Sequence, residues 1–309
     1  MGLGHAGMLV CIPSWPQRHI SNLKMRILFT GASSPLAAGV LQQLLVDNDV
    51  ELWCGRHRKE IPLVDPRLHV IDLDLESDVR AALLRQHFDL VVHFAGVTHE
   101  ANEERYWNVN RDGTIRLAQA VRENGCRRFV YVSTRCATPG SGAYGESKLA
   151  AEAELRKLDW DSLLIVRPAE IYGSDVNEGI DRMLALARRW RVVPALFGHA
   201  NLSFAPLHVD DFCKLAAELI REDAHGVRIE NVCGPEDLSG MALANRIGRR
   251  YRALPLPLWW PVVNICLRAL QTLGFSVVKR DQLTRLVSEK TGTTASAKAR
   301  AGMRRFLAE

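Results

Sequence analysis

The sequence lacks any cysteine motif for a disulfide framework or a metal site, and it lacks a concentrated block of charge. Its 7 cysteines in 309 residues are an odd number, widely spaced, without CxxC or Cys/His spacing. Such a pattern is typical of free thiols in a reducing compartment. The 40 basic and 35 acidic side chains are spread along the chain, which argues against a nucleic-acid-binding protein. We therefore expect a cytoplasmic protein that binds neither metal nor nucleic acid.

Long hydrophobic runs are also absent. The strongest candidate, 254–267, reads LPLPLWWPVVNICL and contains three prolines, whereas a membrane-spanning helix needs about 20 apolar residues. We expect no integral membrane span there, but a helix packed on the protein or a lid on the substrate side. Shallow membrane association through Trp259 and Trp260 is the alternative. Residues 1–24 show no regular periodicity and no signal-peptide pattern, so we expect a disordered extension.

From Met25 onward, short apolar runs alternate with amphipathic segments. Strands are predicted at 26–30, 50–54, 68–75, 89–96, 127–134 and 162–168, and helices at 36–46, 78–88, 102–124 and 145–158. This alternation predicts an α/β fold with a Rossmann-type doubly wound parallel sheet, whose ligands bind beyond the carboxyl ends of the strands. We predict a dinucleotide-binding domain over 25–170. A smaller, mainly substrate-binding region follows over 171–309, with a late strand at 229–234 returning to the sheet.

A turn of small residues follows the first predicted strand. The segment TGASSPLA spans 30–37, and Ser34 and Ala37 stand where a dinucleotide-binding turn usually has glycines after Gly31. Small residues let a pyrophosphate approach the free N–H groups at a helix N-terminus. A purely structural connection between strand and helix is the alternative.

Tyr144 and Lys148 are four residues apart at the start of the helix after the fifth predicted strand, and Thr134 ends that strand. A spacing of four places both side chains on one helical face. A phenol with a pKa of about 10 is a poor acid–base group at neutral pH, but an adjacent ammonium lowers that pKa. The three residues are predicted to form an acid–base set for a carbonyl or an alcohol.

These motifs resemble the extended branch of the short-chain dehydrogenase/reductase family, which contains NAD(P)-dependent nucleotide-sugar epimerases, dehydratases and reductases. The resemblance covers about residues 25–290 and rests on motifs in the family's order: TGASSPLA, Asp74-Leu75, HFAG at 93–96, VNRDGT at 109–114, YVST at 131–134, Tyr144-x-x-x-Lys148, RPAEIYG at 167–173, LHVDD at 207–211 and NVCGPEDLS at 231–239. It implies that Thr134, Tyr144 and Lys148 are catalytic, with Lys148 also holding the nicotinamide ribose. The cofactor-binding residues that it implies are Gly31, Ser34, Pro35, Leu36, Asp74, Leu75, Phe94, Ala95, Gly96, Asn110, Tyr144, Lys148, Pro168 and Ala169.

The type of nicotinamide cofactor depends on the residues after the second strand. An NAD enzyme usually has a carboxylate there for the ribose 2′-hydroxyl, but this sequence has Arg56 and Arg58 and no acidic residue before Glu60. A guanidinium suits a 2′-phosphate, so Arg56 favours NADP slightly over NAD. A solvated surface arginine is the alternative.

The substrate side departs from the family's pattern. Many nucleotide-sugar enzymes carry an arginine for the diphosphate within the stretch that here, at 198–211, has none. Arg285 is the candidate substrate-binding residue, with a surface position as the alternative. His208 and Asp210 are expected to order the substrate loop rather than to act in catalysis.

The resemblance implies an NAD(P)-dependent oxidoreductase or epimerase that acts on a nucleotide-linked sugar by hydride transfer. Arg135 and Cys136 stand where dehydratases carry an Asp-Glu pair, which argues against 4,6-dehydratase chemistry. Epimerases and 4-ketoreductases use the same acid–base residues, so the sequence does not distinguish between these two activities. The alternative is a non-catalytic dinucleotide-binding structural or sensor protein, which the missing glycines favour and the complete acid–base set disfavours. The resemblance also implies a homodimer.

Overall fold

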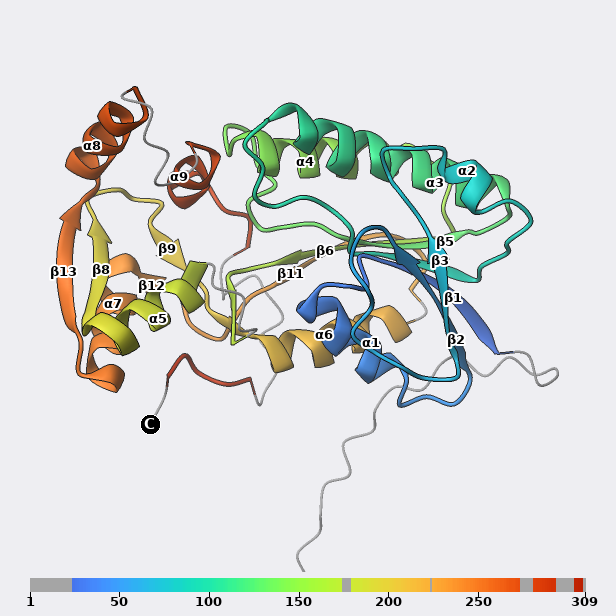
Figure 1. The fold of residues 1–309 in the computed structure, drawn as a ribbon, viewed down its shortest axis with the longest axis horizontal. Coiled ribbons are helices and arrows are strands. Elements are labelled where there is room, and N and C mark those ends of the chain that lie inside the picture. Colours follow the sequence, from blue (N-terminus) through green and yellow to red (C-terminus); the bar gives the residue numbers. More distant parts are fainter. Residues whose placement is uncertain (1–23, 174–178, 223, 273–279, 293–302, 308–309) are drawn as a thin grey trace, which may run out of the picture.

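A seven-stranded sheet, with all its strands parallel, forms the centre of the computed structural model, which describes residues 24–173, 179–222, 224–272, 280–292 and 303–307 (Figure 1). The strand order is β3-β2-β1-β4-β5-β6-β11. The strands are β1 (Met25–Thr30), β2 (Val50–Arg56), β3 (Leu68–Asp72), β4 (Leu90–His93), β5 (Arg128–Val132), β6 (Ser162–Pro168) and β11 (Gly226–Val232). This order is that of the Rossmann fold, and it confirms the predicted fold class.

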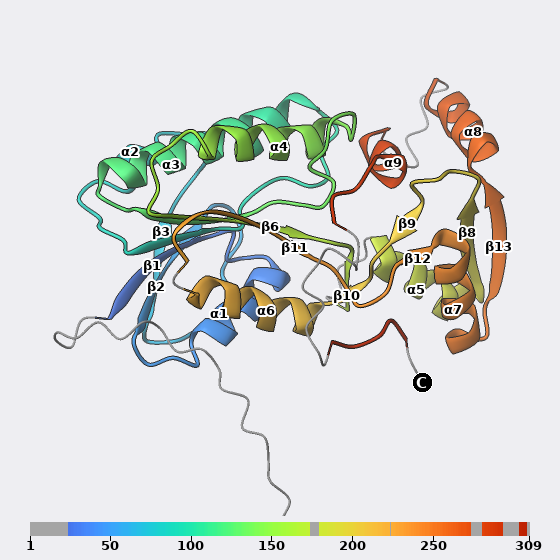
Figure 2. The same ribbon diagram turned by 180° about the vertical axis from the view of Figure 1, so that it is seen from behind.

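Helices cover both faces of this sheet (Figures 1 and 2). One layer contains α1 (Pro35–Leu44) and α6 (Val209–Arg221), and the other contains α2 (Val79–Ala82), α3 (Thr114–Glu123) and α4 (Ala143–Leu155). Alternate residues of β1 enter the two layers, since Ile27 and Phe29 pack with α1 and α6 while Leu28 packs with α3 and α4. Burial on both faces explains why the strands read as continuous apolar runs.

The chain reverses its direction of winding between β1 and β4, and sheets of this kind bind their ligands in the crevice beyond the carboxyl ends of the strands at such a point. Gly31, directly after β1, has a φ of +75°, and a Cβ at this position would lie 2.6 Å from the backbone nitrogen of Ala95. Thr30 Oγ1 and His93 Nδ1, at the ends of the two strands, form a hydrogen bond of 2.6 Å. The backbone conformation and this close approach both require glycine at position 31.

Two predicted helices are built differently from what their periodicity indicates. The helix predicted at 78–88 is reduced to the four residues of α2, and Arg85 has a φ of +62°, which an α-helix cannot include. The helix predicted at 102–124 divides into a π-helix, η1 (Tyr106–Gly113), and α3. Such π-helical turns are frequent at functional sites, and η1 contains Asn110.

The C-terminal part of the chain forms a smaller unit beside the carboxyl ends of the central strands. Helices α5 (Gly179–Trp190) and α7 (Gly240–Tyr251) pack against the pair β8 (Val192–Phe197) and β13 (Leu254–Trp259). Two short pairs complete this part of the chain: β7 (Ile171–Tyr172) with β10 (Leu207–His208), and β9 (Ser203–Phe204) with β12 (Leu238–Ser239). The late strand predicted at 229–234 is β11, which pairs with β6 in the central sheet.

The segment 254–267 is not the single packed helix or lid that we expected. It forms β13 and most of α8 (Trp260–Thr272), and α9 (Arg280–Val287) follows farther along the chain. Pro255 and Pro257 are tolerated in β13 because, in the part of the chain that the structure describes, this strand pairs with β8 alone. Within the described residues, no helix is both long and apolar enough to cross a membrane. Apart from Lys24, the expected N-terminal extension lies outside the described residues.

We expect Gly31→Ala to lower the free energy of unfolding by about 2–4 kcal/mol, because alanine would have both an unfavourable φ and a steric clash with the backbone. Gly140→Ala is the matched control, since Gly140 has a φ of +74° and a Cβ there would meet no atom within 4 Å. We expect the control substitution to lower the free energy of unfolding by only about 1–2 kcal/mol, because it has the unfavourable φ without the clash. Urea unfolding followed by circular dichroism measures both values, and equal losses would contradict the role of the close approach.

Candidate active site

Thr134, Tyr144 and Lys148 meet beyond the carboxyl ends of β4 and β5. Thr134 follows β5, and the other two residues lie in the first two turns of α4. The Thr134 hydroxyl accepts a hydrogen bond from the Cys136 nitrogen at 3.2 Å and lies near enough to the Tyr144 phenol to lower the pKa of that phenol slightly. Lys148 donates from Nζ to the Val132 carbonyl oxygen at 3.1 Å. The hydroxyl and the phenol therefore lie close together, and the amine is held at the end of the strand that leads to the hydroxyl.

The Lys148 amine is buried without a carboxylate as its hydrogen-bond partner. Its side chain is 3% exposed, and Nζ lies 4.8 Å from the centre of the Tyr131 ring. Burial lowers the pKa of Lys148 to about 8, while Glu152 acts in the opposite direction. A Cβ at Gly96 would lie 2.9 Å from Asn110 Oδ1 and 3.1 Å from Nζ, so a larger residue there would crowd both side chains. An ammonium has three N–H donors, and the Val132 carbonyl uses one of them.

The cation that lowers the pKa of Tyr144 differs from the one that the sequence spacing predicts. Burial raises the pKa of Tyr144 to about 12, and the cation that opposes this rise is the guanidinium of Arg285. The carbon at the centre of that guanidinium lies 4.4 Å from the centre of the Tyr144 ring. We expected Lys148 to lower this pKa, but its nitrogen points instead to the backbone of β5.

Arg285 belongs to α9, which packs against the start of α4. Its guanidinium donates to the Thr98 carbonyl oxygen at 2.9 Å and pairs with Asp281 at 2.8 Å. The Asp281 carboxylate, which is 4% exposed as a residue, accepts a hydrogen bond from the Tyr144 backbone nitrogen at 3.0 Å. Arg285, predicted to bind the substrate, thus holds α9 against the tyrosine in this structure. Asp281 is not among the predicted site residues, although its spacing of four from Arg285 indicates a helical ion pair.

The turn after β1 directs the N-terminus of α1 toward the crevice. Ser34 is the N-cap of α1, because its Oγ accepts a hydrogen bond from the Ala37 nitrogen at 3.1 Å. Pro35 occupies the first position of the helix, where it leaves no backbone donor unsatisfied. Leu36 packs against the core between α1 and the sheet. This arrangement fits an anion held by backbone N–H groups.

Asp74 and Leu75, the two residues predicted to flank the adenine, make contacts within the protein. Asp74 Oδ1 accepts a hydrogen bond from the Glu76 nitrogen at 2.9 Å and lies 3.7 Å from His57 Nε2. Leu75 is 7% exposed, and its carbonyl oxygen accepts from Arg116 at 3.1 Å.

The residues after β4 are fixed from both sides. Phe94 stacks on Phe29 with ring centres 5.1 Å apart, and Ala95 donates its backbone N–H to Thr30 Oγ1 at 3.3 Å. The Asn110 side chain accepts from the Val97 nitrogen at 2.8 Å and donates to the Val97 oxygen at 3.0 Å. The implied role of Asn110 in holding backbone geometry agrees with these contacts.

Pro168 and Ala169 stand where β5, β6 and β11 end. The Pro168 carbonyl oxygen accepts from the Arg135 nitrogen at 3.0 Å, and the Ala169 nitrogen donates to the Val232 oxygen at 2.8 Å. The loop that carries Thr134 is thereby tied to the end of β6.

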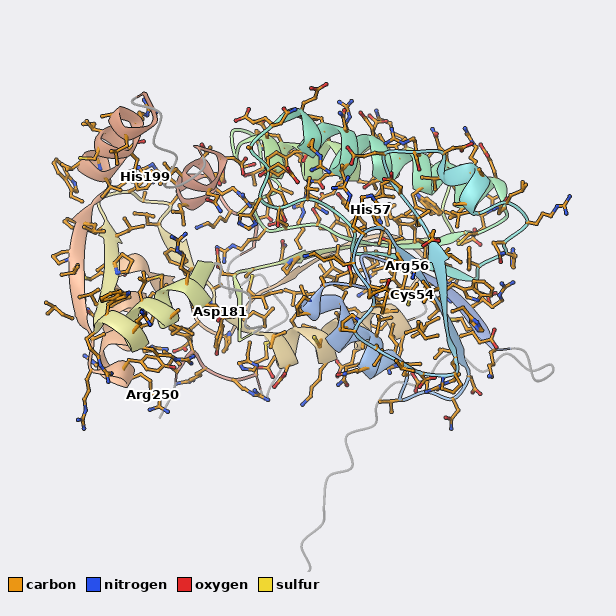
Figure 3. The ribbon with its side chains drawn as sticks, viewed as in Figure 1. Cys54, Arg56, His57, Asp181, His199 and Arg250 are labelled. Carbon is orange, nitrogen blue, oxygen red and sulfur yellow. The ribbon has the colours of Figure 1, made fainter. Side chains whose placement is uncertain are left out.

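Arg56 does not present a free guanidinium at the end of β2 (Figure 3). Its Nε donates to Asp72 at 2.9 Å, and its Nη1 lies 3.2 Å from Glu60. The hydrogen bond to Asp72 is the main cause that raises the pKa of Arg56. The contact of Arg56 with Asp72 was not predicted, because Asp72 is distant in the sequence. It comes from β3, where it is the register partner of Arg56.

A buried group of charges behind Thr134 was also missed. Arg135 is 3% exposed and lies 3.4 Å from Glu170, and Lys290 lies 3.9 Å from the same carboxylate. Lys290 also donates to the Ser203 oxygen at 2.7 Å, and Thr291 donates its backbone N–H to the Arg135 oxygen at 2.9 Å. These contacts fix the C-terminal segment against the loop after β5.

His208 and Asp210 make contacts at the start of α6. The His208 ring caps α6 by accepting from the Asp210 nitrogen at 3.2 Å. Arg304, near the end of the chain, pairs with Asp210 at 2.8 Å.

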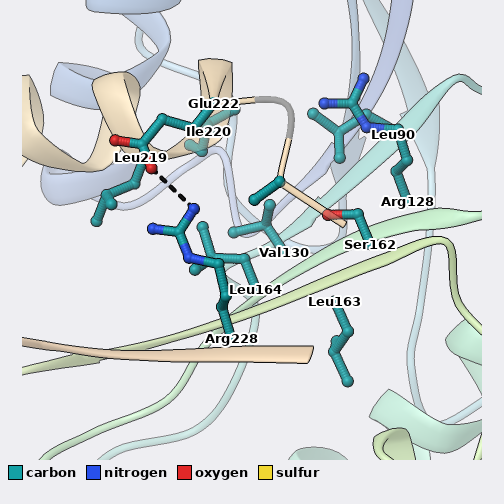
Figure 4. A pocket seen from close by; sticks show the side chains of 11 residues that line it. Leu90, Arg128, Val130, Ser162, Leu163, Leu164, Leu219, Ile220, Glu222 and Arg228 are labelled. Carbon is teal, nitrogen blue, oxygen red and sulfur yellow. Dashed lines mark hydrogen bonds and ion pairs between the residues drawn. The ribbon is translucent and has the colours of Figure 1, made fainter. Parts of the chain in front are cut away.

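A small cavity lies at the opposite end of the central strands (Figure 4). It lies where β5, β6 and β11 begin, beside the ion pair of Arg228 with Glu222 at 2.8 Å. Its volume is about 10 Å³, which is room for at most a single water molecule.

With this geometry described, comparison with known proteins assigns the chain to a family. Residues 27–234 match the NAD dependent epimerase/dehydratase family, and the chain belongs to it. This confirms the resemblance to the extended short-chain dehydrogenases/reductases.

Individual relatives are similar to this chain over parts of their length. A ceramide reductase of Caulobacter vibrioides is 32% identical over 50% of this chain and 47% of its own. A UDP-glucose 4-epimerase of Vibrio cholerae is 24% identical over 75% of this chain and 79% of its own. The chain spans less than half the length of several such relatives, including 23% of a Mycobacterium tuberculosis protein.

Solved structures show the same fold. The Bordetella bronchiseptica enzyme WbmG, solved with NAD and UDP, superimposes with a TM-score of 0.65 at 20% identity, over 77% of this chain and 82% of its own. At this identity the likeness establishes the fold alone.

The buried Lys148 amine makes stability depend on pH. Its pKa is about 8 in the folded protein against 10.5 for the ordinary group, so the unfolded chain binds more protons between these values and stability rises with pH. In the wild type we expect the free energy of unfolding to rise by about 1–2 kcal/mol between pH 8 and 9.5, and we expect Lys148→Met to remove this rise. Urea midpoints of the wild type and the variant measure this difference. Parallel pH profiles of the two proteins would contradict the described burial.

Proposed function

We propose that this protein is an NAD(P)-dependent oxidoreductase or epimerase in which Tyr144 exchanges a proton with a substrate oxygen. The observation that carries this proposal is the position of Thr134, Tyr144 and Lys148 at the carboxyl end of β5, with Thr134 near the phenol and Lys148 on the Val132 carbonyl. A bound nicotinamide would supply or accept the hydride.

The residues present fit a dinucleotide. Gly31 lets the turn after β1 approach the backbone after β4 closely, and the capped N-terminus of α1 offers N–H groups to a pyrophosphate. Gly96 leaves space beside Lys148, whose remaining donors are suited to ribose hydroxyls. Pro168 and Ala169 are proposed to border the nicotinamide side.

The proton chemistry follows from the environment of Tyr144. Because its pKa is about 12 in the protein alone, the phenol is protonated at neutral pH and is set to donate a proton, as reduction of a carbonyl requires. The Thr134 hydroxyl would hold the same substrate oxygen. The Arg285 guanidinium, 4.4 Å from the ring, would stabilise the phenolate that remains after proton transfer.

A nucleotide-linked sugar is the first substrate class that we propose. It is supported by the family and by similarity to a UDP-glucose 4-epimerase. Arg285 is engaged by Asp281 and Thr98, so binding of a diphosphate there requires the guanidinium to exchange partners.

A second candidate is a lipid that bears a carbonyl or a hydroxyl group. It is favoured by the similarity to a ceramide reductase and by the exposed apolar side chains of α8, including Ile265 at 67% exposure. Both candidates use the same acid–base set. The non-catalytic alternative differs from both, because it implies dinucleotide binding without turnover.

A homodimer and a cytoplasmic location stay predictions from the sequence.

Tyr144→Phe tests the proton-exchange role. We expect a loss of turnover of about 10²–10⁴-fold with dinucleotide affinity nearly unchanged, because only the phenol oxygen is removed. Tyr251→Phe is the control, since Tyr251 ends α7 in the smaller unit. Absorbance of reduced nicotinamide follows turnover with UDP-, dTDP- and GDP-sugars and with a sphingoid ketone. Undiminished turnover in the Tyr144 variant would rule out the mechanism.

The choice of cofactor depends on the carboxylates around Arg56. We expect the double variant Asp72→Asn, Glu60→Gln to raise the affinity for NADP relative to NAD by about tenfold, because it frees the guanidinium and removes two repulsive charges. Asp65→Asn is the control, because Asp65 pairs with Arg67 at 3.0 Å outside the site. Fluorescence titration gives both affinities. An unchanged ratio in the double variant and in Arg56→Ala would show that Arg56 does not contact the ribose.

A further inference from the structure

Strand β13 and helix α8 form the outer edge of the smaller C-terminal unit, at the end of the molecule away from β1, β2 and β3 (Figures 1 and 2). Within the described residues β13 pairs with β8 alone, so its other edge faces outward. Helix α8 follows β13 directly, and both elements carry exposed apolar side chains.

Helix α8 is apolar on two faces. One face, with Trp260, Val263 and Leu267, packs on a cluster that includes Leu283 of α9. The second face has helical spacing and is exposed; it consists of Val262, Ile265, Cys266, Ala269 and Leu270. Val262 is 50% exposed and Ile265 is 67% exposed. A helix that faces only water has polar residues on its outer side, so this second face indicates a partner.

The outward face of β13 is apolar as well. Register places Pro255 opposite Val193, which is buried against α5 and α7. Leu254 and Leu256 therefore lie on the other face, and they are 63% and 40% exposed. Trp259, at the junction with α8, is 53% exposed.

The charge of this segment has one sign. No aspartate or glutamate occurs at 238–280, whereas this stretch contains six arginines and one lysine. Four of these arginines are exposed: Arg249, Arg250 and Arg252 at the end of α7, and Arg268 on α8 (Figure 3 labels Arg250). Basic and apolar side chains therefore occupy the same end of the molecule.

We propose that this basic–apolar surface (Leu254, Leu256, Trp259, Val262, Ile265 and Leu270, with the four exposed arginines) docks on the anionic surface of a phospholipid membrane. Apolar side chains with a tryptophan enter the boundary between headgroups and acyl chains, while arginines contact the lipid phosphates. With 13 residues, α8 is shorter than the about 20 that a span needs, so it would lie in the interface. A second copy of the chain fits less well, because a symmetric contact would bring equal positive charges together.

The position of this surface relates it to the candidate active site. Helix α8 packs on α9 through Leu283, and α9 presents Asp281 and Arg285 to Tyr144. Docking would place that site one helix away from the lipid. The membrane contact itself is independent of the proposed function, because its test needs no turnover.

Sedimentation with lipid vesicles tests the proposal. The full chain should bind vesicles of phosphatidylcholine mixed with phosphatidylglycerol about tenfold more tightly than vesicles of phosphatidylcholine alone, and added salt should weaken this binding. Ile265→Glu should reduce the affinity about tenfold or more, because it removes an inserted side chain and adds a negative charge. Each Arg→Gln change at 249, 250 and 252 should reduce it about fivefold.

Val64→Glu is the matched control. Val64 is a 98% exposed apolar residue in the connection between β2 and β3, so this variant makes the same kind of change far from the surface and should bind like the wild type. Circular dichroism verifies that all variants are folded. The proposal is overturned by an absence of binding to the mixed vesicles, or by equal binding of Ile265→Glu and the wild type. It is also overturned if Ile265→Glu instead abolishes a dimer seen by light scattering.

Discussion

The interaction on which the site depends is the burial of the Lys148 amine between the ends of β4 and β5. An ammonium in the interior is unfavourable unless it is paired, and here its hydrogen-bond acceptor is the Val132 carbonyl. Its neighbours are arranged around it: Gly96 has no side chain to fill its space, and Asn110 fixes the backbone of the adjoining loop through Val97. Among the described residues this amine has one backbone carbonyl as its hydrogen-bond acceptor, and a buried amine of this kind is typical of a binding site.

The smaller C-terminal unit completes this site rather than only standing beside it. Asp281 holds the backbone of Tyr144, and Arg285 lies over its ring. One helix, α9, therefore determines both the position of the phenol and the sign of the charge nearest to it. Because α8 packs on the other side of α9, any partner of α8 acts close to the chemistry.

The sequence predicted the features that depend on local pattern. Alternating apolar runs predicted the central parallel sheet and the late strand that returns to it, and the spacing of Tyr144 and Lys148 predicted their common face. The sequence failed where a contact joins elements that are distant in the chain. Asp72 meets Arg56 only because β2 and β3 are register partners, and Arg285 reaches Tyr144 only because α9 returns to α4. Local propensity also failed at 254–267, where pairing with β8 makes a proline-containing stretch an edge strand.

A crystal structure with bound nicotinamide dinucleotide tests the central claim most directly. The account predicts the pyrophosphate at the N-terminus of α1, a ribose hydroxyl within hydrogen-bonding distance of Lys148 Nζ, and the nicotinamide ring facing the Tyr144 phenol. A dinucleotide bound away from the crevice, with the Lys148 donors unused, would contradict it.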